Sequence, residues 1–241
     1  MEQQPHPISP KIDSTGAWSY FPGVTVICPL PAESRRRLES AAERALAAQP
    51  TLSQYFAPLP AASYHVTIAG VTNRGRTATR SDWLGTVRAK TAAGWPELAD
   101  NLRRMQLKPA VVFKRFFSPN ASIVGFDVAL ADESQNQLIE EARRLVCEGG
   151  KLPQYQALHC TLGYQYQRIP AAEEQVVKSE LAAVQASVRQ ALLAEPPVMQ
   201  LEAARLCWYR GMVQFIEWDG RSVPEELVAD REVGSSLANY M

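Results

Sequence analysis

The residues best suited to chemistry are two histidines in closely similar settings. His65 lies in SYHVTIAG and His159 in ALHCTLGY, and the whole chain has only three histidines. A threonine follows each of them two positions later, as Thr67 and Thr161. Imidazole titrates near neutral pH, so one ring can accept a proton while the other donates one. Threonine hydroxyls can donate hydrogen bonds to non-bridging phosphate oxygens. These residue types indicate proton transfer at a phosphate group.

The two-residue spacing between each histidine and its threonine is explained by strand geometry. Both stretches have the pattern of β-strands, in which residues i and i+2 point to the same side. Each histidine thus shares a face with its threonine, while the apolar neighbours suit a core. The next residues on the polar faces are Ala69 and Gly163, both small, which leaves room for a ligand. Two such faces opposing each other would form one cleft with a base, an acid and hydrogen-bond donors.

The sequence gives no sign of a metal site or of a cofactor. The histidines are not part of an HExxH motif, and no cluster of cysteines or acidic residues accompanies them. The chain contains no CxxC pair, and Cys28, Cys160 and Cys207 fall in apolar, strand-like runs typical of reduced thiols in a core. We therefore expect chemistry that requires neither a metal nor a cofactor.

Composition limits the partners. Lys plus Arg and Asp plus Glu both number 25, so a nucleic-acid partner would be a small piece and not a long duplex. The N-terminus has no apolar segment like that of a signal peptide, and no stretch is long and apolar enough to span a membrane. We expect a soluble, cytoplasmic monomer that does not contact a membrane.

The elements around the two motifs repeat in order. The patterns predict strands at 23–30, 63–71, 109–117, 121–131, 152–164, 196–209 and 212–220, and helices at 31–49, 81–93, 96–107, 132–148 and 170–195. Each histidine strand is the third element of its half, which indicates an internal duplication. We expect an α+β fold of two duplicated lobes, each a small, mainly antiparallel sheet with outer helices, related by a pseudo-twofold axis around a central cleft.

The duplication also suggests how the chain is divided. We expect a flexible N-terminal arm (1–20), a bilobal domain (21–218) whose lobes span roughly 21–118 and 119–218, and a C-terminal extension (219–241). His6 lies in the polar, proline-rich arm, so we expect it to be dispensable.

Two tetrapeptides resemble the paired H-x-T/S-x signature of the two-histidine (2H) phosphoesterase superfamily: His65-Val66-Thr67-Ile68 and His159-Cys160-Thr161-Leu162. That superfamily includes bacterial RNA 2′,5′-ligase-like proteins and 2′,3′-cyclic nucleotide phosphodiesterases. The stretches FPGVTVICPL, YHVTIAG and LHCTLGYQYQ look most similar to an uncharacterised, mostly bacterial branch, and the resemblance covers roughly residues 21–218. It implies two duplicated lobes, the histidines as the acid–base pair, the threonines as phosphate ligands, and no metal requirement.

Further candidates for substrate binding lie near the motifs. Tyr164 follows the second motif, and Trp208 and Tyr209 end a strand, so each offers a ring on which a base could stack. Strand parity places Tyr164 on the face opposite His159 unless a β-bulge intervenes. Arg74, in the loop after the first motif, could reach a phosphate.

We interpret the chain as a metal-independent phosphodiesterase that hydrolyses a small nucleotide or an RNA end, at a 2′,3′-cyclic phosphate or a 2′–5′ linkage. One alternative is a phosphodiesterase that degrades a cyclic nucleotide or oligonucleotide signalling molecule. Another is a non-catalytic module that binds RNA ends, although binding alone needs no acid–base pair. For the enzyme we expect a bell-shaped pH dependence centred near the ordinary histidine pKa of about 6.5.

Overall fold

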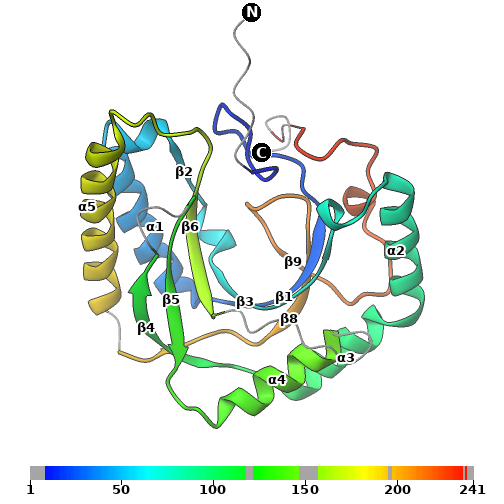
Figure 1. Ribbon diagram of the computed structural model, residues 1–241. Helices are drawn as coiled ribbons and strands as arrows, with labels where there is room; N and C mark the ends of the chain where they lie inside the picture. Colours follow the sequence, from blue (N-terminus) through cyan, green and yellow to red (C-terminus); the bar gives the residue numbers. More distant parts are fainter. Residues whose placement is uncertain (1–8, 118–121, 147–156, 195–196, 236, 238–241) are drawn as a thin grey trace, which may run out of the picture.

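Two antiparallel sheets and five helices make up the part of the chain that the structure describes. The computed structural model describes residues 9–117, 122–146, 157–194, 197–235 and 237. Figure 1 shows the sheets in the middle of the molecule with the helices outside them. This arrangement confirms the expected α+β class. No helix within the described ranges is long and apolar enough to cross a membrane.

The first sheet contains the first histidine strand. Its order is β3-β1-β8-β9, with all neighbours antiparallel, and the strands are β1 Gly23–Pro29, β3 His65–Asn73, β8 Arg205–Tyr209 and β9 Ile216–Glu217. Every residue of β1 is buried, as its β-branched, apolar sequence GVTVICP predicts for a central strand.

The second sheet contains the second histidine strand. Its order is β2-β6-β5-β4-β7, again antiparallel, with β2 Phe56–Pro58, β4 Ala110–Phe116, β5 Ile123–Leu130, β6 His159–Gln165 and β7 Met199–Gln200. One histidine strand therefore lies in each sheet, as the duplication predicts.

The helices cover the outer sides of the sheets and bury one face each. Their bounds are α1 Ala32–Ala47, α2 Arg80–Ala93, α3 Trp95–Met105, α4 Gln135–Val146 and α5 Glu174–Leu193. Helices α1 and α5 pack on each other beside the second sheet, whereas α3 contacts β8 and α4 contacts β3 of the first sheet. Each half of the sequence thus supplies a helix to the other half's sheet.

The sheets do not follow the expected division of the chain near residue 118. Strand β4 precedes that point but pairs with β5 in the second sheet, and β8 and β9 return to the first. The single strand expected at 196–209 is two strands in different sheets. Between them, the N–H of Glu202 donates to Pro29 at the end of β1, and that of Leu201 donates to Pro109 just before β4. These two hydrogen bonds fix the segment in which the chain crosses from the second sheet to the first.

The described residues of both terminal segments pack onto the core, which corrects the expectation of a flexible arm for residues 9–20. Ile12, Trp18 and Tyr20 are buried, as are Leu227 and Leu237 near the C-terminus. The two segments also meet, because the N–H of Leu237 donates to the Trp18 carbonyl at 2.7 Å. The apolar residues of the proline-rich, polar N-terminal segment follow no helical or strand periodicity, so the sequence does not predict that they are buried. The sequence expectations for His6 and for the start of the second histidine strand concern residues outside the described ranges.

Candidate active site

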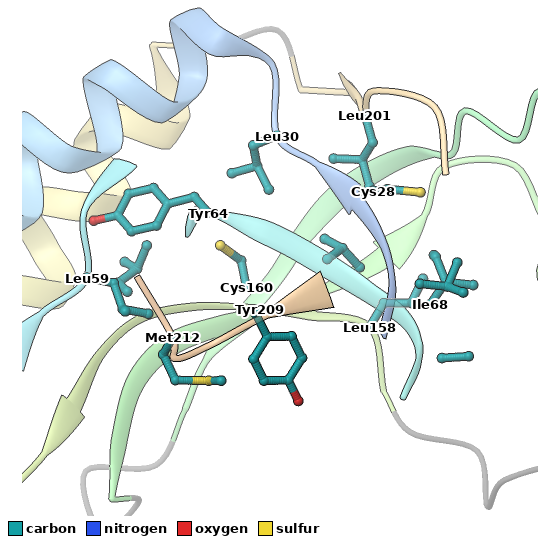
Figure 2. Close-up of a cluster of buried hydrophobic side chains, with 14 of the residues drawn as sticks. Cys28, Leu30, Leu59, Tyr64, Ile68, Leu158, Cys160, Leu201, Tyr209 and Met212 are labelled. Atoms are coloured by element: carbon teal, nitrogen blue, oxygen red, sulfur yellow. The ribbon is translucent and has the colours of Figure 1, made fainter. Parts of the chain in front are cut away.

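The two histidine strands lie next to each other at the junction of the sheets. Strands β3 and β6 are in contact. Their core-facing sides share one buried cluster, in which Figure 2 shows Tyr64 and Cys160 close together. Their other sides line a cavity of about 170 Å³, and His65, His159 and the threonines of both motifs are part of that lining. The fold therefore brings the two H-x-T motifs together around one space.

The remaining lining favours an anion with an apolar portion. It consists of Lys11, Thr25, Leu59, Gly70, Tyr164, Tyr209, Met212 and Phe215. None of the described residues around the cavity is acidic, so no carboxylate repels a phosphate there. Within the described parts of the chain, no three His, Cys, Asp or Glu side chains gather as a set that could ligate a metal.

Each histidine strand has a one-residue register shift three positions after its histidine. The pairing of β1 with β3 skips Ile68, and the pairing of β5 with β6 skips Leu162. Such an extra residue is a β-bulge, and it reverses the alternation of side chains beyond it. The two motifs thus share a backbone irregularity as well as a spacing, which supports their origin by duplication.

The bulges overturn the expectation that Ala69 and Gly163 continue the polar faces. Ala69 is buried, and a methyl group on Gly163 would lie 2.8 Å from the carbonyl oxygen of Ala57. Gly70 and Tyr164 line the cavity instead. A methyl group on Gly70 would meet nothing within 4 Å, so the first motif leaves open space where the second presents a phenol.

The same backbone contact orients both imidazoles. His65 Nδ1 lies 2.6 Å from the carbonyl oxygen of Ser63, and His159 Nδ1 lies 3.0 Å from that of Ala157. Because a carbonyl only accepts hydrogen bonds, these contacts assign the proton to Nδ1 of each ring. Each Nε2 can then accept a proton, or donate one when the ring is charged. In both motifs the carbonyl belongs to the residue two positions before the histidine.

The two rings differ in their surroundings. Phe215 packs on His65 with the ring centroids 4.2 Å apart, whereas Phe117 meets His159 nearly edge-on at 5.6 Å. Burial, reinforced by the nearby His159 and Lys11, lowers the pKa of His65 from 6.5 to about 4, although its bond to a backbone carbonyl opposes the shift. His65 is therefore neutral at pH 7 and has the protonation state of a general base.

The other predicted binding residues fall in different places. Tyr164 and Tyr209 line the cavity, whereas Trp208 is buried and does not. Arg74 is also absent from the lining, because its guanidinium donates to the carbonyl and hydroxyl oxygens of Thr77 at 3.0 and 3.1 Å. Arg74 thus forms hydrogen bonds within its own loop, and the structure does not support its expected role as a phosphate ligand.

Sequence reasoning missed six residues of the lining: Lys11, Thr25, Leu59, Gly70, Met212 and Phe215. Thr25 lies in β1, whose apolar sequence predicts a core strand, and only its hydroxyl distinguishes it from its apolar neighbours. That hydroxyl donates to the Ala69 carbonyl at 3.2 Å. Lys11 comes from the segment expected to be flexible, and Met212 and Phe215 come from the loop between β8 and β9. No local pattern marks a residue that reaches a site by tertiary packing alone.

Comparisons with known proteins agree with the two-histidine interpretation. Residues 11–104 match the family model of the 2H-phosphodiesterase domain, described as a domain of unknown function (DUF1868). The match contains the first motif and begins at Lys11, while the second motif lies beyond it. The resemblance inferred from the motifs is thereby confirmed. A search of curated proteins found no match.

A solved bacterial structure has a similar fold. A conserved protein of unknown function from Agrobacterium tumefaciens superimposes with a TM-score of 0.60 at 18% sequence identity, covering 90% of this chain and 93% of that one. Usb1 from Kluyveromyces marxianus with uridine monophosphate gives a TM-score of 0.43 at 15% identity, covering 85% of this chain and 99% of that one. The bacterial structure shows that the arrangement of sheets and helices recurs in another protein.

Proposed function

We propose that this protein is a metal-independent hydrolase of the two-histidine type that acts on small nucleotides or RNA ends, with a 2′,3′-cyclic phosphate or a 2′–5′ linkage as its target. The observation that carries the proposal is the paired anchoring of the two imidazoles. Both Nδ1 atoms are engaged by backbone carbonyls, and both rings belong to one cavity that has no acidic group among its described residues.

The roles follow from the environments of the two rings. The neutral His65 takes a proton from water, and the water oxygen forms a bond to phosphorus. The bond from phosphorus to the ribose 2′ or 3′ oxygen breaks, and a charged His159 protonates that leaving oxygen. The hydroxyls of Thr67 and Thr161 donate to the non-bridging oxygens, where negative charge increases in the transition state. One water is consumed, and the rings exchange protons with solvent before the next turnover.

The size and lining of the cavity favour a small substrate. A cavity of about 170 Å³ lies below the usual range of roughly 300–1,000 Å³ for ligand pockets, which favours a small substrate or one that extends beyond the cavity toward solvent. Tyr209 and Phe215 have ring centroids 5.1 Å apart and form an aromatic wall beside His65. Such a wall suits the flat face of a base or the apolar face of a ribose.

The direct test is a hydrolysis panel of 2′,3′-cyclic nucleotides, 3′,5′-cyclic nucleotides, and 2′–5′ and 3′–5′ dinucleotides, each with excess EDTA. We expect turnover of a 2′,3′-cyclic phosphate or a 2′–5′ linkage. Selective turnover of a 3′,5′-cyclic nucleotide would replace this substrate with a signalling molecule. Binding of RNA ends without any turnover would contradict the enzymatic role, and activity that needed a divalent ion would contradict the metal-free mechanism.

A further inference from the structure

A lysine from the N-terminal segment lies in the same cavity as the two histidines. The ammonium group of Lys11 donates to the Tyr164 hydroxyl at 3.3 Å and lies 5.0 Å from the centroid of that ring. No carboxylate within the described residues forms an ion pair with it. Lys11 is thus the one lysine or arginine among the described residues of the lining, and no described carboxylate pairs with it.

The segment that carries Lys11 is held in place by its own hydrogen bonds. The Lys11 carbonyl accepts from the N–H of Ser19 at 3.1 Å, which closes residues 9–19 into a hairpin. The Asp13 carboxylate accepts the N–H groups of Thr15 and Ala17 at 2.8 and 3.0 Å and fixes the turn. We call residues 9–19 the N-terminal hairpin; it is the dark blue segment near the top of Figure 1.

The hairpin is also seated on the second histidine strand. Trp18 meets the ring of Tyr164 edge-on with centroids 6.1 Å apart, and the Gln167 amide donates to the Ser14 carbonyl at 2.9 Å. Ile12, next to Lys11, has no exposed surface. The lysine is therefore presented by a packed backbone and not by a solvated arm, so little conformational entropy remains to be lost when it binds a ligand.

We propose that Lys11 is a substrate-binding residue of this active site, whose ammonium group binds a non-bridging oxygen of the phosphate held between the two histidines. The inference rests on the proposed function and assigns to that site a component from outside both motifs. A partly enclosed cation without a carboxylate partner is best satisfied by an anionic ligand, and a phosphodiester provides one.

The charge acts mainly on the transition state. A phosphodiester carries one negative charge, and attack by the nucleophile adds negative charge on the equatorial oxygens. The threonines supply neutral donors, whereas the attraction of the Lys11 ammonium group increases as that charge develops. Interactions that strengthen only in the transition state raise kcat more than they lower KM. Tyr164 positions the ammonium group, since its hydroxyl accepts the lysine's hydrogen bond.

Lys11 also affects the protonation of His65. The charged and titratable groups that share the cavity lining with that ring are Lys11 from the hairpin, His159 and Tyr164 from β6, and Tyr209 from β8; in addition, the Cys160 thiol contacts the His65 backbone. The ammonium charge disfavours the protonated ring. Its removal should raise the pKa of His65 and move the acidic limb of the pH profile of kcat/KM to higher pH. Loss of a merely structural contact would not move that limb.

The test compares Lys11→Met, Lys11→Arg and the control Lys178→Met, a lysine exposed on α5, using the substrate that the wild type hydrolyses best in the panel. For Lys11→Met we expect kcat to fall by about 10- to 100-fold, KM to change less, and the acidic limb to move upward. Lys11→Arg should recover part of the rate, and Lys178→Met should match the wild type. Thermal unfolding of each variant checks that the fold is intact.

Binding of inorganic phosphate, measured by calorimetry, separates this inference from the proposed function. We expect the wild type to bind phosphate and Lys11→Met to bind it at least about 10-fold more weakly. An inactive wild type that shows this difference would contradict the proposed function but keep the lysine as an anion ligand. An active wild type with unchanged kinetics and phosphate binding in Lys11→Met would overturn the role of Lys11, as would a wild type that binds no phosphate.

Discussion

At the scale of single residues, two equal motifs place their histidines in different surroundings. Both histidines donate Nδ1–H to a carbonyl two positions earlier. His65 is the one packed against Phe215 and next to Lys11, and its lowered pKa leaves it neutral. In the proposed mechanism, the division into base and acid therefore comes from the surroundings of each motif and not from the motif itself. That is why the sequence predicted a pair but not which histidine is the base.

The lowered pKa of His65 predicts the shape of the pH profile. A general base is active when deprotonated, so a lower pKa keeps it active to lower pH. We expect the acidic limb of kcat/KM, which reports on the free enzyme, to fall with an apparent pKa near 4 and not near 6.5. Circular dichroism across the same range verifies that the protein stays folded. An acidic limb centred at pH 6.5 would show that the burial of His65 has no such effect.

The two threonines should matter less than the histidines. Thr67→Ala and Thr161→Ala each remove one neutral hydrogen bond, for which we expect kcat/KM to fall by about 3- to 10-fold. Steady-state kinetics on the best substrate of the panel checks this, with Thr91→Ala on α2 as a control outside the cavity lining. A loss as large as that caused by removing a histidine would mean that a threonine takes part in proton transfer.

At the scale of elements, the bulges determine which side chains reach the cavity beyond each H-x-T triplet. The bulged residue of β3, Ile68, is stabilised by a hydrogen bond from α4. The buried Arg143 on that helix donates its Nε–H to the Ile68 carbonyl at 3.0 Å. A bulge leaves a backbone group without a partner in its ladder, and this arginine satisfies one. A helix from one half thereby stabilises the histidine strand of the other.

Removal of that arginine should destabilise the protein. Arg143→Met leaves a buried carbonyl without its charged donor, for which we expect a loss of about 1.5–3 kcal/mol in the free energy of unfolding. Denaturant titration measures it, with Arg103→Met as the control because Arg103 forms an exposed ion pair with Asp100. Equal stability of the two variants would argue against a supporting role for Arg143.

Much of the element order was predictable, since alternation and amphipathic periodicity mark β1, β3, β5, α4 and α5 directly. The duplication also predicted that His65 and His159 would occupy equivalent strands. The bulges at Ile68 and Leu162 were not predictable, because a register shift depends on the neighbouring strand and leaves no mark in the strand's own pattern. This one difference reversed the expected positions of Ala69, Gly163 and Tyr164.

At the scale of the whole molecule, segments distant in sequence complete both sheets and the cavity. The first sheet needs β8 and β9 from the far end of the chain, and the cavity needs the N-terminal hairpin. Local patterns do not encode such long-range pairings, which explains why the division near residue 118 and the flexible arm were expected. The described fold is a single interwoven unit in which the N-terminal hairpin lines the same cavity as both motifs.

The packing of the hairpin predicts its contribution to stability. Ile12 is fully buried, so Ile12→Ala should lower the free energy of unfolding by about 2–5 kcal/mol. The control is Leu193→Ala, since that leucine is 76% exposed and should have little effect. Chemical denaturation of both variants provides the comparison. If Ile12→Ala unfolded like the wild type, the hairpin would not be part of the core.

The central claim is that two imidazoles act as one acid–base unit without a metal. It is tested by the turnover of a 2′,3′-cyclic nucleotide in excess EDTA by the wild type, His65→Ala, His159→Ala, the double variant and the control His6→Ala. We predict that EDTA leaves the wild type active and that each single change costs on the order of 100-fold or more. The double variant should lose little beyond the worse single change, and His6→Ala should match the wild type. Near-normal turnover by His159→Ala, or full loss of wild-type activity in EDTA, would contradict the account.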